Sequence, residues 1–205
     1  MMLKICGMTR QADLDCAQEL GFDFCGFIFH AKSPRHLAPQ MAAGLQSGVM
    51  RRVGVFVEHE PGEILEIMRI ARLDYAQLHG DYDREAVALI GAGRVIRVLW
   101  PQRYAAREAM LREAAKADCA WYLLDAGPSG GGSGAALAWR ELAGLALPAP
   151  WFLAGGLAAG NVGPALAACS PHGLDFNSGL EQSHGCKSHA KMRAAVRALA
   201  EREAR

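Results

Sequence analysis

The sequence predicts a single closed (βα)8 barrel, the TIM-barrel class of α/β fold, over residues 1–205. Short apolar runs alternate with helical patterns in eight units of about 25 residues, and such alternation implies parallel strands. Glycine and polar residues follow the C-terminal ends of the runs, which is where such a barrel builds its site. No linker or charge block divides the chain, so we expect one domain. An open doubly wound sheet is the structural alternative.

The elements follow one another in a regular order. The expected strands are Leu3 to Cys6, Phe24 to Phe29, Arg52 to Val57, Tyr75 to Leu78, Val95 to Leu99, Trp121 to Asp125, Trp151 to Ala154 and Leu174 to Phe176. The expected helices are Gln11 to Leu20, Pro39 to Val49, Pro61 to Arg72, Arg84 to Ile90, Ala105 to Ala115, Trp139 to Leu145, Asn161 to Ala168 and His189 to about Glu203. Each expected strand is therefore followed by a helix.

The first expected strand carries a thiol to the rim of the barrel. Strand side chains alternate between the two faces, so Lys4 and Cys6 both point into the barrel interior. Gly7 lets the chain turn, and Thr9 is placed to cap the first helix. The plainer alternative is that Cys6 is an ordinary small buried residue.

Composition favours a small-molecule partner. The chain has 22 basic and 21 acidic residues and a formal net charge of +1, so nucleic acid and anionic membranes are not expected to be its main partners. There is no basic-then-apolar leader and no apolar run of 18 residues, so we expect a cytoplasmic protein. We expect it to be a monomer or a homodimer. Six cysteines without a CxxC pair indicate neither disulfides nor a zinc site.

Two glycine-containing turns suggest a phosphate site. AGGL follows the seventh strand and contains Gly155 and Gly156, whereas NSGLE follows the eighth and contains Asn177, Ser178 and Gly179. Small residues leave the backbone N–H groups of such turns approachable by a phosphate. Each turn alone could be an ordinary tight turn. Neither GxGxxG nor GxxxxGK[ST] is present, so no cofactor and no metal are expected.

Cys6 and Asp125 are the candidates for proton transfer. Asp125 ends the apolar run WYLLD at the top of the sixth strand, and a carboxyl group there can act as a general acid. Cys6 lies on the first strand, across the barrel. An acid and a base on opposite walls of a phosphate-binding mouth suit the isomerisation of a sugar phosphate. The alternative for Asp125 is that it caps the Gly/Ser-rich loop from Gly127 to Gly134.

A free thiol is a weak base at neutral pH, because its pKa is near 8.5. Lys4 lies two residues before Cys6, about 6 to 7 Å away on the same face, so its cation is expected to favour the thiolate. Asp175, on the strand that closes against the first, is expected to hold Lys4 in place. In the competing account Lys4 pairs with Asp175 only for structure, and substrate binding alone activates the thiol.

Seven motifs follow one another along the chain: KICGMT, GFIFHAKSPRHL, RVGVFV, QLHG, LLDAGPSGGGSG, LAGGLAAGNV and LDFNSGLE. Through these motifs, and over essentially its whole length, the chain resembles the phosphoribosylanthranilate isomerase family. The resemblance implies a cofactor-free barrel that converts N-(5-phosphoribosyl)anthranilate to 1-(2-carboxyphenylamino)-1-deoxyribulose 5-phosphate, an Amadori rearrangement of tryptophan biosynthesis. It also implies that Cys6 is the general base, that Asp125 is the general acid, and that Arg35 holds the anthranilate carboxylate.

Rival functions share part of this pattern. A related barrel isomerase of histidine biosynthesis is implied to carry aspartate where Cys6 stands, and the tryptophan synthase α-subunit would need a carboxylate pair not found at matching positions. The third rival function is that of a non-catalytic phosphate-binding barrel. Its only support is that the charged residues usual in the family after GGSG are replaced here by Ala135, Ala136, Leu137 and Ala138. Asn177 also stands where serine is usual, and Ser188-His189 where an acidic residue is common.

Overall fold

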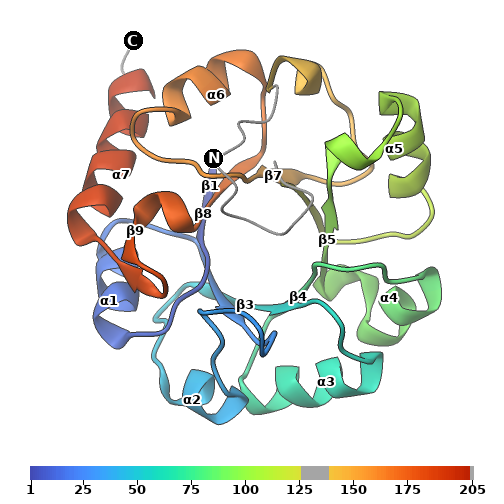
Figure 1. Ribbon diagram of the computed structural model, residues 1–205, viewed down its shortest axis with the longest axis horizontal. Coiled ribbons are helices and arrows are strands. Elements are labelled where there is room, and N and C mark those ends of the chain that lie inside the picture. Colours follow the sequence, from blue (N-terminus) through green and yellow to red (C-terminus); the bar gives the residue numbers. More distant parts are fainter. Residues whose placement is uncertain (126–138, 204–205) are drawn as a thin grey trace.

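The computed structural model, which describes residues 1–125 and 139–203, confirms the barrel. Eight parallel strands form one closed ring (Figure 1). The last strand pairs with the first, which places Lys4 beside Asp175. An open sheet is therefore excluded. The strands are β1 (Met2–Ile5), β2 (Phe24–Ile28), β3 (Arg51–Phe56), β4 (Tyr75–Leu78), β5 (Val95–Leu99), β6 (Trp121–Leu124), β7 (Trp151–Leu153) and β8 (Gly173–Phe176).

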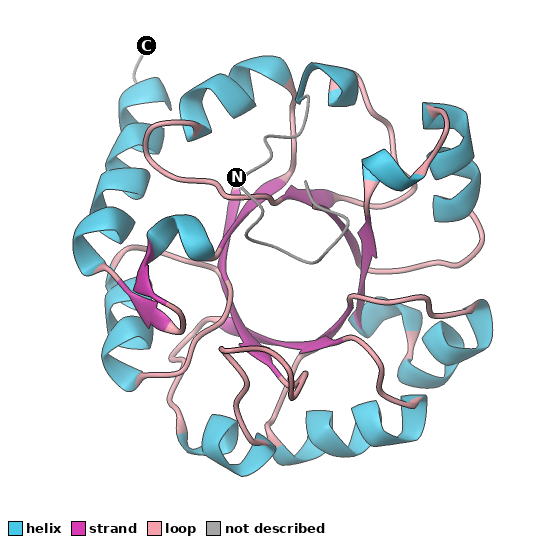
Figure 2. Cartoon of the chain, in the orientation of Figure 1, coloured by secondary structure: helices cyan, strands magenta, loops and turns pink. Residues whose placement is uncertain are grey.

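Helices surround the ring of strands (Figure 2). Their apolar sides pack on the outer face of the sheet and bury the main core. The helices are α1 (Gln11–Glu19), α2 (Pro39–Gly44), α3 (Pro61–Ile70), α4 (Arg84–Ile90), α5 (Arg107–Ala114), α6 (Val162–Ala168) and α7 (His189–Glu203), with 3-10 turns η1 (Ala92–Arg94), η2 (Pro101–Arg103), η3 (Trp139–Leu142) and η4 (Ser178–Leu180). None of these helices is long and apolar enough to cross a membrane.

Aromatic rings fill the interior of the barrel. The ring of Phe24 meets that of Phe152 edge-on at 5.3 Å, and Phe152 stacks on Trp121 at 4.5 Å. Phe24 and Trp121 begin their strands and Phe152 is the second residue of β7, so the three rings close the N-terminal end of the barrel. The C-terminal end, where smaller and polar side chains gather, is left to form a cavity.

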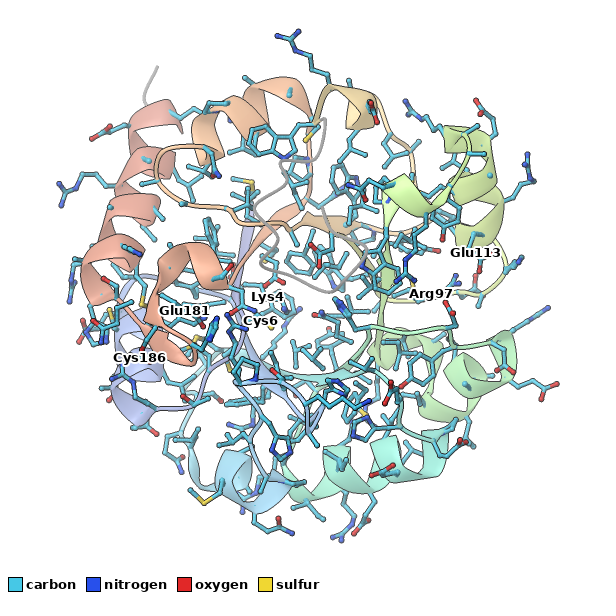
Figure 3. The ribbon with its side chains drawn as sticks, viewed as in Figure 1. Lys4, Cys6, Arg97, Glu113, Glu181 and Cys186 are labelled. Carbon is cyan, nitrogen blue, oxygen red and sulfur yellow. The ribbon has the colours of Figure 1, made fainter. Side chains whose placement is uncertain are left out.

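Some predicted helix boundaries were wrong. The helix expected over Pro39 to Val49 ends at Gly44, because the Arg52 guanidinium donates to the carbonyls of Ala42 at 2.6 Å and Leu45 at 2.9 Å. These contacts replace the hydrogen bonds that a longer helix would supply. At the end of α5 another arginine bonds to a terminal carbonyl in the same way. Arg97, labelled with Glu113 in Figure 3, donates to the carbonyl of Ala114 at 3.0 Å.

The predicted helix over Trp139 to Leu145 is only the 3-10 turn η3, so the expected helix after β6 is not found in the described chain. Gly144 follows it with φ +62°, a left-handed conformation that stops helical extension. Thr9 does not cap α1. The N-cap residue is Arg10, and no side-chain hydrogen bond caps the first turn. The Thr9 hydroxyl instead donates to the carbonyl of Gly185 at 2.5 Å.

Gly185 belongs to a hairpin that the sequence did not predict. Strands β9 (Glu181–Ser183) and β10 (Cys186–Lys187) pair antiparallel outside the barrel, near α1 and α7 (Figure 1). Gly185 has φ +73°, a left-handed conformation that glycine adopts without steric cost. The Thr9 contact therefore fastens this hairpin to the loop after β1.

Candidate active site

A cavity of about 360 Å3 opens at the C-terminal ends of the strands. Most of the predicted site residues meet there, although they come from five different strand ends. Of the predicted set, only Lys4 and Gly179 do not line its wall. Those that line it are Cys6, Arg35, Asp125, Gly155, Gly156, Asp175, Asn177 and Ser178.

Cys6 directly follows β1, and its N–H donates to the Phe176 carbonyl at 2.8 Å. Beneath it, the wholly buried Lys4 places its Nζ 2.9 Å from Oδ1 of Asp175, as expected from their pairing across β1 and β8. Figure 3 shows Lys4 and Cys6 together on the inner side of β1. Burial is the largest influence and opposes the charge of Lys4, but its pairing with Asp175, and with Cys6 whenever that thiol ionises, raises the pKa of Lys4. The lysine is therefore a cation.

The pKa of the Cys6 thiol is nevertheless raised above its ordinary value. Burial is the largest cause; the charge of Lys4 lowers this pKa, Asp175 raises it and Lys187 lowers it. Lys4 thus acts on the thiol in the predicted direction, but it does not overcome burial. Without ligand, Cys6 is a protonated thiol.

Replacing Lys4 with methionine is expected to raise the pKa of Cys6 further. The variant removes the cation whose charge favours the thiolate. The measurement is the rate of Cys6 alkylation by iodoacetamide against pH, with the site assigned by mass spectrometry. The rate profile of the variant should lie at higher pH than that of wild type. Superimposable profiles from a folded variant would show that Lys4 serves structure alone.

Asp125 directly follows β6 and is 5% exposed. Its N–H donates to the Leu99 carbonyl at 3.1 Å, which fixes the backbone at the rim while the residue lines the cavity. The predicted loop from Gly127 to Gly134 lies outside the described residues, as do the changes at Ala135, Ala136, Leu137 and Ala138.

Arg35 reaches the cavity by crossing the loop after β1. Its aliphatic stem lies over Gly7, where a Cβ would come within 2.7 Å of the arginine Cδ and 2.9 Å of Oδ1 of Asn177. Glycine is therefore required at position 7 for close approach as well as for its φ of +72°. The guanidinium forms a bidentate pair with Glu181, Nε to Oε1 at 2.8 Å and Nη2 to Oε2 at 2.7 Å.

The two predicted phosphate turns face the same side of the cavity. Gly155 and Gly156 have φ of +109° and +68°, and a Cβ on Gly156 would meet no atom within 4 Å. Its backbone is thus open to a ligand. Gly179 instead packs against the Leu157 carbonyl, where a side chain would not fit. The Asn177 amide oxygen accepts a hydrogen bond from Lys187 Nζ at 2.9 Å.

Comparison with known proteins decides the family. The model of the N-(5'-phosphoribosyl)anthranilate (PRA) isomerase family matches residues 3–198. The N-(5'-phosphoribosyl)anthranilate isomerase of Desulfovibrio desulfuricans is 54% identical over 205 residues, which cover 99% of this chain and 97% of the relative. The chain belongs to the PRA isomerase family.

Solved PRA isomerases have the same fold. The structure from Thermus thermophilus superposes with a TM-score of 0.84 at 36% identity and covers 98% of this chain and 99% of its own. A second structure, with a TM-score of 0.78 at 29% identity and the same coverage, was solved in complex with reduced 1-(o-carboxyphenylamino)-1-deoxyribulose 5-phosphate. That ligand carries both a carboxylate and a phosphate.

A polar wall of the cavity received no role from the sequence. Gln77, His79 and Trp100 line it from the ends of β4 and β5, and Gln77 Oε1, His79 Nδ1 and Trp100 Nε1 are buried without a partner in the described chain. Burial, followed by the charge of Lys4, lowers the pKa of His79 to about 4, so its imidazole is neutral at pH 7. These atoms can hydrogen-bond a bound ligand.

Sequence reasoning also missed Glu181 and Lys187, which lie behind the cavity wall. The Nζ of Lys187 is 3.0 Å from Oε1 of Glu181, and both residues are buried. The available signal was weak: Glu181 ends the NSGLE motif, and Lys187 follows a short polar stretch. No group of three or more His, Cys, Asp or Glu residues within residues 1–125 and 139–203 could hold a metal ion.

Proposed function

We propose that this chain is a PRA isomerase that converts N-(5-phosphoribosyl)anthranilate to 1-(2-carboxyphenylamino)-1-deoxyribulose 5-phosphate in tryptophan biosynthesis. The observation that carries the proposal is that Cys6 and Asp125 line one cavity together with an arginine and the turns at Gly155-Gly156 and Asn177-Ser178. The relatives carry the same activity in their names. The substrate carries a reacting sugar for Cys6 and Asp125, a carboxylate for the arginine and a phosphate for the two turns.

Asp125 is the general acid. It donates a proton to the furanose ring oxygen as the bond from that oxygen to C1 breaks, and the nitrogen lone pair forms a Schiff base with C1. Burial and a fixed backbone hold the carboxyl group at the rim, as directed proton delivery requires.

Cys6 is the general base. Its thiolate removes the proton from C2, and the electron pair moves to form an enolamine, which becomes the ketone when C1 takes up a proton and the C2 hydroxyl loses one. Because the resting thiol is protonated, only its ionised fraction reacts, and the Lys4 cation increases that fraction. The reaction is an internal oxidation and reduction, C2 being oxidised as C1 is reduced, so no external oxidant is consumed.

The two anionic ends of the substrate bind to different groups of the cavity wall. Arg35 binds the anthranilate carboxylate, because a guanidinium fork matches the two oxygens of a planar anion. The turns at Gly155-Gly156 and at Asn177-Ser178 bind the phosphate through backbone N–H groups. Gly179 contributes by letting the second turn pack on the first.

Growth of auxotrophs tests the proposal against its rivals. Expression of this chain in a tryptophan auxotroph that lacks PRA isomerase should restore growth without tryptophan, and the variants Cys6→Ala and Asp125→Asn should not. A histidine auxotroph lacking the related barrel isomerase tests the alternative substrate. Failure to rescue the tryptophan auxotroph by a well-expressed protein would favour a non-catalytic barrel.

A side chain at Gly156 is expected to weaken phosphate binding. Gly156→Ala places a methyl group in the open space from which the phosphate approaches, and φ +68° adds backbone strain of about 1 kcal/mol. We expect KM to rise and the inhibition constant of inorganic phosphate to rise about tenfold, the cost of one charge-assisted hydrogen bond. Gly160→Ala, at an open position with no positive φ, is the control. Unchanged inhibition by phosphate would move the site elsewhere.

We place this reaction in the cytoplasm, with the protein acting as a monomer or a homodimer. Every residue given a role above comes from one chain, so the described site needs no second copy. Sedimentation equilibrium of the purified protein measures the oligomeric state, and a stable species larger than a dimer would contradict this expectation.

A further inference from the structure

The guanidinium of Arg35 is held by one edge only. Glu181 accepts hydrogen bonds from Nε and Nη2, which form the side edge of the fork. Nη1 has no partner among residues 1–125 and 139–203. Arg35 lines the cavity, whereas Glu181 does not. The outer edge of the guanidinium fork, which carries Nη1, is therefore available to a ligand. The side edge is bound by Glu181, which lies behind the cavity wall.

Glu181 is itself firmly held. Lys187 Nζ donates to its Oε1 at 3.0 Å and the Gly185 N–H donates to the same oxygen at 3.2 Å. Burial alone would raise the pKa of this carboxyl, but the hydrogen bond from Arg35 and the charge of Lys187 lower it to about 2. Glu181 is thus an anion at any pH at which the enzyme would work.

Lys187 connects this carboxylate to the second anion site. Its Nζ also donates to Oδ1 of Asn177 at 2.9 Å, in the turn after β8. Its backbone is fixed as well, because its N–H donates to Asp13 at 3.1 Å and its carbonyl accepts from Arg10 at 3.2 Å. A continuous buried chain of contacts therefore runs from Arg35 through Glu181 and Lys187 to Asn177.

We infer that Glu181 is a positioning residue, held by Lys187, that keeps the outer edge of the Arg35 fork directed at the substrate carboxylate. The inference deepens the proposed function and rests on it. A free arginine side chain loses rotamer entropy when it binds an anion, and a fork already clamped at one edge loses less. Lys187 further fixes the distance between this fork and the phosphate turn, so both ends of one ligand find their sites together.

Two other roles for Glu181 make different predictions. If Glu181 only held the hairpin together, its loss would weaken every ligand alike. If it occupied Arg35 as an internal substitute for the substrate carboxylate, its loss would strengthen binding of carboxylated ligands. A positioning role predicts a selective loss for ligands that carry the carboxylate.

The experiment uses two ligands and calorimetry. One is reduced 1-(o-carboxyphenylamino)-1-deoxyribulose 5-phosphate, and the other is the same molecule without the ring carboxylate. For Glu181→Gln we expect Kd to rise about tenfold or more for the first and less than about twofold for the second, since a charge-assisted bond is involved. In an Arg35→Ala background, Glu181→Gln should cost little more, because the two act as a unit.

The matched control is Glu66→Gln on α3. Glu66 forms the same bidentate pair with Arg69, at 2.9 and 2.6 Å, on the exposed surface, so this variant should leave both Kd values unchanged. Equal losses for both ligands, no loss, or tighter binding by Glu181→Gln would each overturn the inference. Should Glu181→Gln fail to fold, Glu181→Asp, which keeps the charge but shortens the reach, is judged by the same criterion. Wild type that binds neither ligand would instead refute the proposed function.

Discussion

Asp125→Asn is expected to lower kcat by about 10²-fold or more while the variant still binds the reduced product analogue. Asparagine has nearly the same shape as aspartate but cannot supply the proton that the ring oxygen needs, and general acid catalysis is typically worth that factor. Steady-state kinetics give kcat, and calorimetry with the analogue gives Kd. A fall in kcat with unchanged Kd assigns Asp125 to the chemical step rather than to binding.

The control for this variant is Asp118→Asn, a substitution outside the cavity lining. It should behave as wild type. Turnover by Asp125→Asn within a few-fold of wild type would mean that another group is the acid and that Asp125 caps the loop that follows it.

Cys6→Ala is expected to lower kcat by about 10² to 10⁴-fold, because no other base then lies on the β1 wall to remove the C2 proton. Binding of the reduced analogue should change little, since Cys6 is 4% exposed and the removed thiol is small. Cys16→Ala removes another buried thiol, on α1, and is the matched control. If Cys6→Ala retained wild-type turnover, the thiol would be an ordinary packing residue.

Strand periodicity was enough to predict the inner face of β1 and its partner. Alternation placed Lys4 and Cys6 on one face, and barrel closure placed Asp175 beside Lys4, because parallel pairing leaves few registers. The ionisation of Cys6 could not be read from sequence in the same way. Whether the pKa of Cys6 is raised or lowered depends on how the effect of burial compares with that of the neighbouring charges. The extent of burial is a property of the packed barrel.

The contacts of Glu181 with Arg35 and Lys187 could not be predicted from the sequence, for a different reason. Arg35 and Glu181 are 146 residues apart, and their pairing exists only because a short polar hairpin folds back over the loop after β1. That hairpin also explains the wrong prediction for Thr9, whose hydroxyl was expected to cap α1 but binds Gly185 instead. At each of these positions a contact between distant parts of the chain overrides the local preference of the sequence.

The most direct test of the central claim is turnover of N-(5-phosphoribosyl)anthranilate by the purified protein, with the product identified by NMR. The account predicts that wild type forms 1-(2-carboxyphenylamino)-1-deoxyribulose 5-phosphate without added metal or cofactor, and that the double variant Cys6→Ala/Asp125→Asn binds the reduced analogue but forms none above the uncatalysed rate. No product from folded wild type, or product formed by the double variant at the wild-type rate, would contradict it.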